Sequence, residues 1–277
     1  MMKPLIRVTQ LESFRRYLSG EYAYVTEQDV IDNITKKFEG NDYTRIGTAF
    51  HSIVETGSPH CFKEPEGVRH FTYYKKDKTE PVPKGRRFVF DEVEAILDIP
   101  QCKVALKYRN EHPGAFHEVR EYKDFGNAVI TGCADMIDGL EIRDIKTKYG
   151  PVSDKDYIDS CQWQLYLELF EADVFHFDLF VFEGYNKDKH KGDVRGLKLT
   201  PYEPAITCYR YPGMEDKNHA LLRDFLKWAE MRELLPYLPL TESDGQYNDR
   251  KGIAHRQCRG NTQQERWRAV QKESCSS

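Results

Sequence analysis

The residues of this chain that are best suited to catalysis lie within one short stretch. Positions 132–146 read GCADMIDGLEIRDIK and contain two aspartates and a lysine, Asp135, Asp144 and Lys146. Two carboxylates about 4 Å apart repel each other by about 4 kcal/mol at an effective dielectric constant of about 20. A divalent cation offsets that repulsion, because hard cations prefer oxygen ligands. Mg²⁺ or Mn²⁺ held there could activate a water molecule and neutralise the charge that builds on a phosphate, while Lys146 orients that water or stabilises the pentavalent phosphorus.

A β-hairpin would bring these three side chains together. Asp138 and Gly139 form a pair that is typical of a two-residue hairpin turn, which would place Ile137 opposite Leu140. Because side chains alternate along a strand, both aspartates and the lysine then share one face, apolar near the turn and charged at the far end. A slip of one residue in the register would move the first aspartate to the opposite face.

The same stretch also has a plainer interpretation. An isolated D-x-K is most often a surface salt bridge, here between Asp144 and Lys146, with Asp135 merely solvated. The apolar residues on the same face and the helix that follows favour a functional site instead.

Hydrophobic periodicity and turn signals predict the elements around this hairpin. Helices are expected at 8–19, 26–38, 47–55, 91–112, 154–171 and 216–235, the fifth with Ser153 as its N-cap. Strands are expected at 117–123, 128–137, 140–147 and 174–183. Residues 57–87, rich in Pro, Gly and Lys, should form loops and short strands, such as a flap over a site. This order predicts an α/β fold with a mixed central β-sheet flanked by helices.

The chain length of 277 residues fits one large domain or one domain with appendages. We expect a main domain at 1–240, with a helical N-terminal part at 1–112 and a catalytic core at 113–185. Apolar residues become scarce from about position 245, so 241–277 should be a polar, mildly basic and mobile tail or a segment that touches a partner.

Composition excludes several classes of protein. No run of residues approaches the roughly 20 apolar positions of a membrane span, and the N-terminus lacks the apolar region of a signal peptide, so a cytoplasmic protein is expected. The seven cysteines include no CxxC pair, which argues against a zinc site and a disulfide framework. The net charge of -4 does not exclude nucleic acid, because a basic groove can lie on an acidic protein.

Four short motifs in order resemble the PD-(D/E)xK nuclease superfamily, and within it the RecB-like exonuclease branch. They are G-x-x-x-H, G-x-x-D, D-x-K and Q-x-x-x-Y, which begin at Gly47, Gly132, Asp144 and Gln162. Each motif alone is weak, but together they cover roughly residues 8–183 in the family's order. The spacing of the motifs and the general character of the sequence are most similar to those of phage recombination exonucleases of the RecE type. Those enzymes act on duplex ends beside a strand-annealing protein. The resemblance implies a restriction-endonuclease-like core.

The resemblance also implies a set of metal ligands. These would be His51, Asp135, Asp144 and the main-chain carbonyl of Ile145, holding Mg²⁺ or Mn²⁺. The imidazole would bias the site toward Mn²⁺ more than an all-oxygen site would. Glu118 lies where relatives often place an additional acid, and Glu121 is its rival three residues further on.

Lys146 would be the catalytic lysine in this interpretation. Gln162 and Tyr166 are four residues apart, so they share one helix face and could both reach the metal-bound water or the DNA backbone. Taken alone, each of these residues has an ordinary alternative, an interior histidine for His51 and plain helix surface for Gln162 and Tyr166. Arg15 and Arg16, in the predicted first helix, could contact phosphate or simply face solvent.

Several features of relatives are missing from this sequence. Some relatives bind an iron–sulfur cluster through one cysteine early in the chain and three clustered cysteines near the C-terminus. This chain has only Cys258 and Cys275 near its C-terminus, so no cluster is expected. The chain also lacks a P-loop and helicase motifs. Relatives include rings that thread DNA, which leaves a homo-oligomer open.

The sequence therefore predicts a metal-dependent exonuclease that hydrolyses phosphodiester bonds from DNA ends, in recombination, repair or phage DNA processing. The alternatives are a structure-specific or restriction-like endonuclease, a nuclease-dead DNA-binding module, and an enzyme acting on some other phosphoester. Affinity for DNA should come mainly from phosphate contacts and fall with salt.

Overall fold

The computed structural model describes residues 2–36, 40–57, 69–74, 85–90, 93–241 and Trp267. Its strands are β1 (Lys3–Arg7), β2 (Arg69–Tyr74), β3 (Gly85–Phe90), β4 (Val93–Asp98), β5 (Phe116–Asp124), β6 (Val129–Asp138), β7 (Glu141–Lys148), β8 (Val174–Phe182), β9 (Leu199–Pro201), β10 (Ile206–Tyr209) and β11 (Leu240–Thr241). Its helices are α1 (Val8–Ser19), α2 (Glu27–Thr35), α3 (Asp42–Thr56), α4 (Ile99–Glu111), α5 (Asp154–Ile158), α6 (Gln162–Leu169), α7 (Lys187–His190) and α8 (Met214–Met231), with a 3-10 turn at Leu235–Tyr237.

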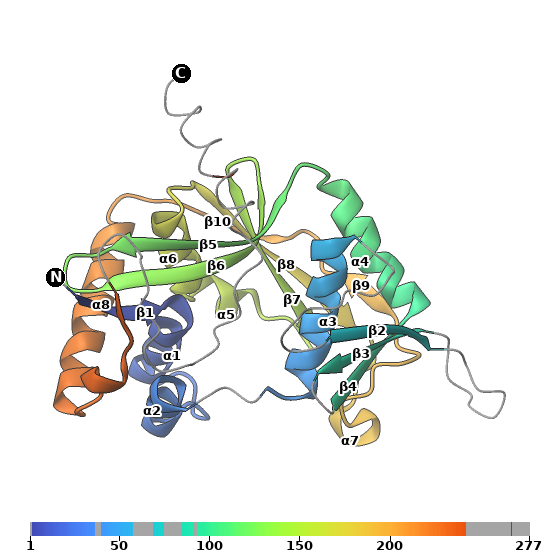
Figure 1. Ribbon diagram of the computed structural model, residues 1–277, viewed down its shortest axis with the longest axis horizontal. Helices are drawn as coiled ribbons and strands as arrows, with labels where there is room; N and C mark the ends of the chain where they lie inside the picture. Colours follow the sequence, from blue (N-terminus) through green and yellow to red (C-terminus); the bar gives the residue numbers. More distant parts are fainter. Residues whose placement is uncertain are drawn as a thin grey trace.

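A mixed sheet of eight strands organises the molecule (Figure 1). Its main order is β10-β8-β7-β6-β1-β11, with β5 also on β6 and β9 also on β8. The pairs β1–β6 and β7–β8 are parallel, and β5–β6 and β6–β7 are antiparallel. Strands β2, β3 and β4 form a separate antiparallel sheet. The predicted mixed sheet flanked by helices is confirmed.

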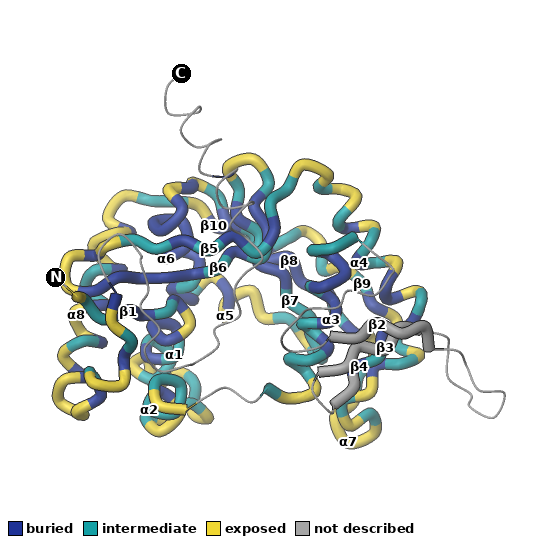
Figure 2. Tube along the Cα trace, viewed as in Figure 1, coloured by how far each residue is buried: buried dark blue, intermediate teal, exposed yellow. Residues whose placement is uncertain are grey.

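Two apolar cores lie on the two faces of this sheet. One is shared with α1, α6 and α8 and includes Phe14, Phe177 and Phe225. The other is shared with α3 and α4 and includes Phe50 and Phe180. Figure 2 shows the central strands as largely buried and the loops as exposed. The first core therefore holds α1 and α6 on one face of the sheet, and the second holds α3 on the other. Side chains from helices on both faces can reach the central strands.

The β6–β7 hairpin differs by two residues from the predicted register. Ile137 pairs with Ile142 instead of Leu140, and the two turn residues are Gly139 and Leu140. Gly139 has a φ of 63°, the left-handed value that the first position of a type II′ turn requires. The turn therefore begins one residue later than the sequence suggested.

Asp138 stays in the strand because its carboxylate contacts His112, a residue outside the hairpin. Its Oδ2 lies 2.5 Å from Nδ1 of His112, directly after α4. A shift of two residues leaves every side chain on its predicted face, so Asp135 is still on the same side of the hairpin as Asp144 and Lys146.

Two predicted helices were wrong in their extent. Residues 93–98 form a strand, and the helix begins only at Ile99. Pro100 explains this boundary, because its ring would clash with the carbonyl four residues earlier if the helix extended backward. The helix predicted at 154–171 is divided into α5 and α6, since the N–H of Cys161 donates to Oε2 of Glu12 at 2.9 Å.

Other expectations were met in part. The first helix has the predicted bounds, α2 ends at Thr35, and α3 begins earlier than predicted, at Asp42. Strands β1, β9, β10 and β11 and helix α7 were not predicted. Most of the proposed flap at 57–87 lies outside the described residues, apart from Gly57, β2 and part of β3. Along the described part of the chain, none of the helices combines the length and the apolar character that crossing a membrane requires.

The predicted tail at 241–277 lies outside the described residues apart from Thr241 and Trp267. The side chain of Trp267 is fully buried, and its ring centroid lies 6.0 Å from that of Phe116 at the start of β5.

Candidate metal centre and active site

The candidate site lies where β6 and β7 separate. The two strands pair over only three residue pairs from the turn, ending at Met136 and Arg143. Beyond that point the carboxylate of Asp135 replaces a backbone partner, because its Oδ2 accepts the N–H of Ile145 at 2.8 Å. Strand β6 then continues beside β1 and β5, whereas β7 continues beside β8. A carboxylate is thus built into the point where the sheet opens.

Helix α3 brings His51 to this point. Gly47, one turn earlier, faces β7, and a Cβ there would lie 3.4 Å from Oγ1 of Thr147, which is still van der Waals contact. Nε2 of His51 lies 2.7 Å from the carbonyl oxygen of Ile145. A carbonyl can only accept a hydrogen bond, so Nε2 carries the proton, and Nδ1 of a neutral imidazole presents its lone pair.

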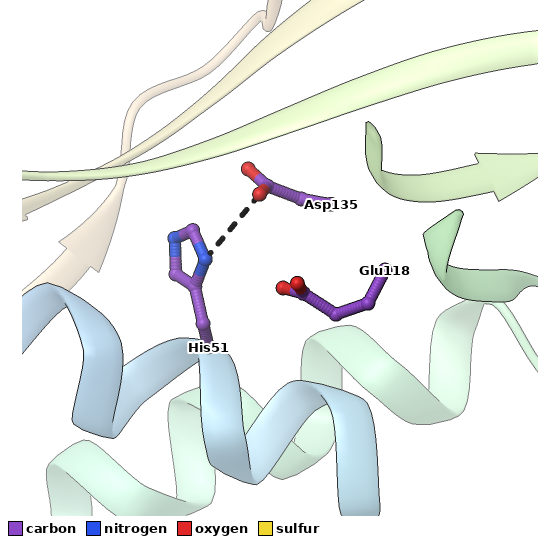
Figure 3. A group of neighbouring side chains, drawn as sticks. All are labelled: His51, Glu118 and Asp135. Atoms are coloured by element: carbon purple, nitrogen blue, oxygen red, sulfur yellow. Dashed lines mark ion pairs between the residues drawn. The ribbon is translucent and has the colours of Figure 1, made fainter. Parts of the chain in front are cut away.

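That lone pair faces a carboxylate. Nδ1 of His51 lies 3.5 Å from Oδ1 of Asp135, and Figure 3 shows Glu118 directed toward the same space. One ligand atom from each of these three residues lies within 4.8 Å of the other two. Oε2 of Glu118 also accepts the S–H of Cys133 at 3.8 Å. A divalent ion could bind an electron pair from all three residues at once, whereas a proton bridges only two.

Glu118 reaches this space through an unusual backbone conformation. Its φ is 53°, in the left-handed region that costs a residue other than glycine about 1–3 kcal/mol. The β5–β6 ladder is paired on both sides of Glu118 but lacks the pair that would join it to Asp135. Strained backbone of this kind is concentrated at functional sites. Glu121 lies opposite Gly132 instead and is not a member of the group.

The separations fit a small divalent ion. Mg²⁺ has bonds of about 2.0–2.1 Å, so neighbouring ligands are about 3 Å apart and opposite ligands about 4.2 Å apart. The 3.5 Å between His51 Nδ1 and Asp135 Oδ1 is close to the first value. Imidazole nitrogen and carboxylate oxygen suit Mn²⁺ as well as Mg²⁺.

Asp144 is held apart from that group by polar partners of its own. Its Oδ1 accepts hydrogen bonds from Nζ of Lys146 and from Nε2 of Gln162, both at 2.8 Å. Lys146 Nζ is also 2.7 Å from Oδ2, but without the alignment of a hydrogen bond, so Oδ2 is a buried oxygen that lacks an aligned donor. This oxygen makes no hydrogen bond, so it could bind a metal ion in addition to its ion pair with Lys146.

The charges of Asp144 and Lys146 depend on each other. Burial raises the pKa of Asp144, the charge of Lys146 opposes that rise, and the nearby charge of Asp135 adds to it. Burial also works against the charge of Lys146, but the carboxylates of Asp144 and Asp135 outweigh it and raise the pKa of the lysine. Lys146 is therefore a cation at neutral pH, next to two acids.

Tyr166 lies elsewhere than the motif suggested. Its hydroxyl donates to the carbonyl of Cys133 at 2.9 Å and accepts from the N–H of the same residue at 3.2 Å. A Cβ on Gly132 would lie 3.1 Å from Cζ of Tyr166 and 3.0 Å from Leu169, so this glycine lets α6 approach β6 closely. In this arrangement Tyr166 positions the strand that carries Asp135, and Gln162 alone of the pair reaches the acids.

Sequence reasoning missed the part played by Glu12. Its carboxylate is buried in α1 and accepts hydrogen bonds from the Cys161 N–H at 2.9 Å, from Arg15 Nη2 at 2.9 Å and from Arg16 Nε at 2.7 Å. It thereby fixes the start of α6, where Gln162 lies. A signal was present, because Glu12 lies four residues after Val8, on the apolar stripe of the helix.

Comparisons with known proteins add little to this geometry. No protein-family model matches the chain, and no curated protein matches it. A phage-related exonuclease from Haemophilus somnus 129PT is 13% identical, with 82% of this chain and 95% of that chain covered and a TM-score of 0.41. A candidate exonuclease from Eubacterium rectale is 12% identical, with 86% and 84% covered and a TM-score of 0.43. TM-scores this low do not support a functional argument, which therefore rests on the residues of this chain.

Proposed function

We propose that this chain is a divalent-metal-dependent deoxyribonuclease that hydrolyses phosphodiester bonds from DNA ends. The observation that carries the proposal is the convergence of His51, Glu118 and Asp135 beside the Asp144–Lys146 pair. Clustered acids cost free energy unless positive charge compensates them, and a divalent cation would add to the compensation that Lys146 provides. Membership of the PD-(D/E)xK superfamily, and of its RecB-like branch, remains a prediction from the motifs.

The residues divide into two roles under this proposal. His51, Glu118 and Asp135 would hold the ion, with the Oδ2 of Asp144 and the Ile145 carbonyl as further donors. When bound, the ion would supply a Lewis acid for the phosphate and a more acidic water. Lys146 would place a positive charge at the scissile phosphate, where negative charge grows in the transition state.

Gln162 and the buried position of Asp144 complete the arrangement. The amide of Gln162 fixes one carboxylate oxygen of Asp144 at 2.8 Å, which leaves the other oxygen in a defined direction. Fixed donors of this kind do not need to reorganise during the reaction. The arrangement therefore suits hydrolysis of a phosphodiester by an activated water and does not require a covalent intermediate.

The test is digestion of end-labelled DNA by the purified full chain. Linear duplex and closed circular DNA of the same sequence are incubated with Mg²⁺, Mn²⁺ or a chelator, with and without excess free nucleotide. We expect labelled nucleotides to be released from the linear DNA only with a divalent ion, and the free nucleotide not to compete. Cleavage of the circle would show an endonuclease instead. No cleavage of these DNAs, or of a matching end-labelled single strand, with any ion would refute the proposal.

A further inference from the structure

A second surface near the candidate site combines arginine and tyrosine side chains. Helix α1 ends at Ser19 and the chain turns back at Gly20, whose φ is 65°. The ring of Tyr22 then lies against two guanidinium groups, with the Cζ atoms of Arg15 and Arg16 at 5.8 and 5.2 Å from the ring centroid. The ring of Tyr24 meets that of Tyr22 edge-on, with centroids 6.0 Å apart. We call these four residues the Tyr22–Tyr24 surface.

The outer ring of this surface is open to solvent. Tyr24 is 74% exposed, so one face of its ring can be reached by a ligand. Its neighbour Tyr22 is half-buried, and its ring packs against the guanidinium groups of Arg15 and Arg16. The face of an aromatic ring attracts a further flat ring, and the cations attract an anion.

The arginines of the surface are held in place. Glu12, 8% exposed, binds Arg15 through both of its oxygens at 3.0 and 2.9 Å, and Arg16 through Oε1 at 2.7 Å. Arg16 makes this contact with Nε and keeps its side chain 35% exposed. An arginine fixed in this way loses little side-chain entropy when it binds a phosphate.

Two hydrogen bonds, connected through the peptide bond between Cys161 and Gln162, join this surface to the candidate active site. Glu12 also binds the N–H of Cys161 at 2.9 Å, and the next residue, Gln162, binds Asp144 at 2.8 Å. Asp144 in turn binds Lys146. The surface and the catalytic lysine therefore lie on the same side of the sheet, a few side chains apart.

Three cations, Arg16, Lys146 and Lys148, lie near this chain of contacts. Burial lowers the pKa of Lys148, the charge of Asp156 opposes that effect, and the charges of Arg16 and Lys146 add to it. Three cations thus lie close enough to repel one another. Glu21, which is nearby, is paired with Lys155 at 3.4 Å. A bound strand of phosphates would relieve the repulsion among the cations.

The combination of exposed aromatic rings and cations selects one class of ligand. Single-stranded nucleic acid binds to proteins by stacking its bases on aromatic side chains while basic groups follow its backbone. A base inside a duplex has both faces covered by its neighbours and cannot stack on a side chain. The surface therefore suits unpaired nucleotides better than an intact duplex.

We propose that the Tyr22–Tyr24 surface binds unpaired nucleotides of the strand that is cleaved, with a base stacked on Tyr24 and a phosphate on Arg16. The proposal rests on the proposed nuclease function for the identity of the ligand. It adds to that function a preference for an unpaired strand next to the scissile phosphate.

Binding in the presence of a chelator tests the surface without cleavage. Fluorescence anisotropy would measure the affinity of the full chain for a labelled 20-nucleotide single strand and for the matching blunt duplex. We expect the single strand to bind more tightly, and Tyr24→Ala to weaken that binding by about 5- to 150-fold, the range for loss of one stacked base. Tyr24→Trp should restore binding. Tyr209→Ala removes a similarly exposed tyrosine (64% exposed) on β10 and should have no effect.

A second variant measures the phosphate contact. Arg16→Gln should reduce the slope of log affinity against log salt by about 0.7, as expected for one phosphate contact on a single strand. A role of Arg16 in folding alone would leave that slope unchanged. Circular dichroism of each variant confirms that the chain is folded.

Three results would overturn the proposal: equal affinity of Tyr24→Ala and the wild type for the single strand, tighter binding of the blunt duplex by the wild type, or no binding of single strands at all. In the last case the surface would be a candidate for docking a protein instead. Cleavage with Mg²⁺ is scored separately, so a wild type that binds single strands but never cleaves would refute the nuclease and leave the surface intact.

Discussion

Asp144 is the residue on which the candidate site depends most at the scale of single side chains. It is buried, and a buried carboxylate is costly unless charged or polar partners compensate it. Lys146 and Gln162 both bind one of its oxygens, which leaves the other for an ion. Its neighbours therefore set both its charge and its direction.

Removing the amide of Gln162 should weaken the site without removing any ligand. We expect Gln162→Ala to lower metal affinity or the cleavage rate by about 10- to 100-fold, because groups that orient metal ligands typically contribute that much. Steady-state cleavage of linear DNA over a range of Mn²⁺ concentrations would measure both. Gln164→Ala is the matched control on the same helix, since that amide binds Tyr211. Similar losses in both variants would show that the effect comes from helix α6 as a whole.

Substitutions of Glu118 separate the function of its carboxylate from the effect of its backbone conformation on stability. Its left-handed φ favours glycine, whereas the proposed ligand requires the carboxylate. We expect Glu118→Gly and Glu118→Gln both to lose metal-dependent activity, but Glu118→Gly to be more stable than Glu118→Gln by about 1 kcal/mol, because glycine relieves the strain. Urea unfolding in a chelator measures this difference. A Glu118→Gln variant as stable as Glu118→Gly, or more stable, would show that the backbone is not strained.

At the scale of elements, the site depends on how α6 is fixed to β6. The buried hydroxyl of Tyr166 satisfies both backbone groups of Cys133, on the strand that carries Asp135 two residues later. Gly132 makes room for the ring. The helix therefore holds an interior strand by side-chain contacts where the ladder to β7 has ended.

Tyr166→Phe tests this contact. The variant keeps the ring but leaves the N–H and the carbonyl of Cys133 without these partners, so we expect a loss of about 1–3 kcal/mol in the free energy of unfolding. Chemical denaturation measures it. Tyr211→Phe is a control, because its hydroxyl binds a side-chain amide instead of the backbone. No difference in stability between Tyr166→Phe and the wild type would show that the hydroxyl does not hold the strand.

The sequence predicted the local elements better than their connections. The first helix has its predicted bounds because its apolar spacing is regular. The hairpin turn was misplaced because the contact between Asp138 and His112 joins two segments that are far apart in the sequence. The helix at 154–171 was not divided because its break depends on Glu12, more than a hundred residues earlier.

The same contrast holds for the candidate site. The resemblance implied a ligand set of His51, Asp135, Asp144 and the Ile145 carbonyl, with Glu118 as an additional acid. The structure groups His51, Glu118 and Asp135 and gives Asp144 partners of its own. The role of all these residues as metal ligands stays a prediction. The spacing of Gln162 and Tyr166 could not show that one reaches Asp144 and the other the backbone of β6. That distinction depends on how deeply each residue of the helix is buried.

At the scale of the whole molecule, two cores on opposite faces of one sheet stabilise the fold. Strand β7 contributes Ile142 to one core and Ile145 to the other. Asp144 and Lys146 of the candidate site lie on the same strand. Loss of a buried group in either core should therefore lower global stability, whereas the polar residues of the site act mainly on activity.

Cys208, buried on β10 in the first core, gives a pH test of global stability. Burial raises the pKa of its thiol from 9.0 to about 11. The folded chain therefore retains a proton that the unfolded chain loses above pH 9, so stability should fall between about pH 9 and 11 by about 3 kcal/mol and then level off. Unfolding of the wild type and Cys208→Ala across this range should show the loss only in the wild type. Other buried thiols and tyrosines titrate equally in both proteins, so parallel curves would contradict the assignment.

The most direct test of the central claim is the rate of nucleotide release from end-labelled linear DNA with Mg²⁺ or Mn²⁺ by the wild type, Asp144→Asn and Lys146→Ala. Asp173→Asn and Lys107→Ala serve as controls, because these side chains are 81% and 78% exposed and lie outside the candidate site. We expect each site variant to be at least about 100-fold slower, with both controls at the wild-type rate. Wild-type rates in Asp144→Asn and Lys146→Ala would contradict the account.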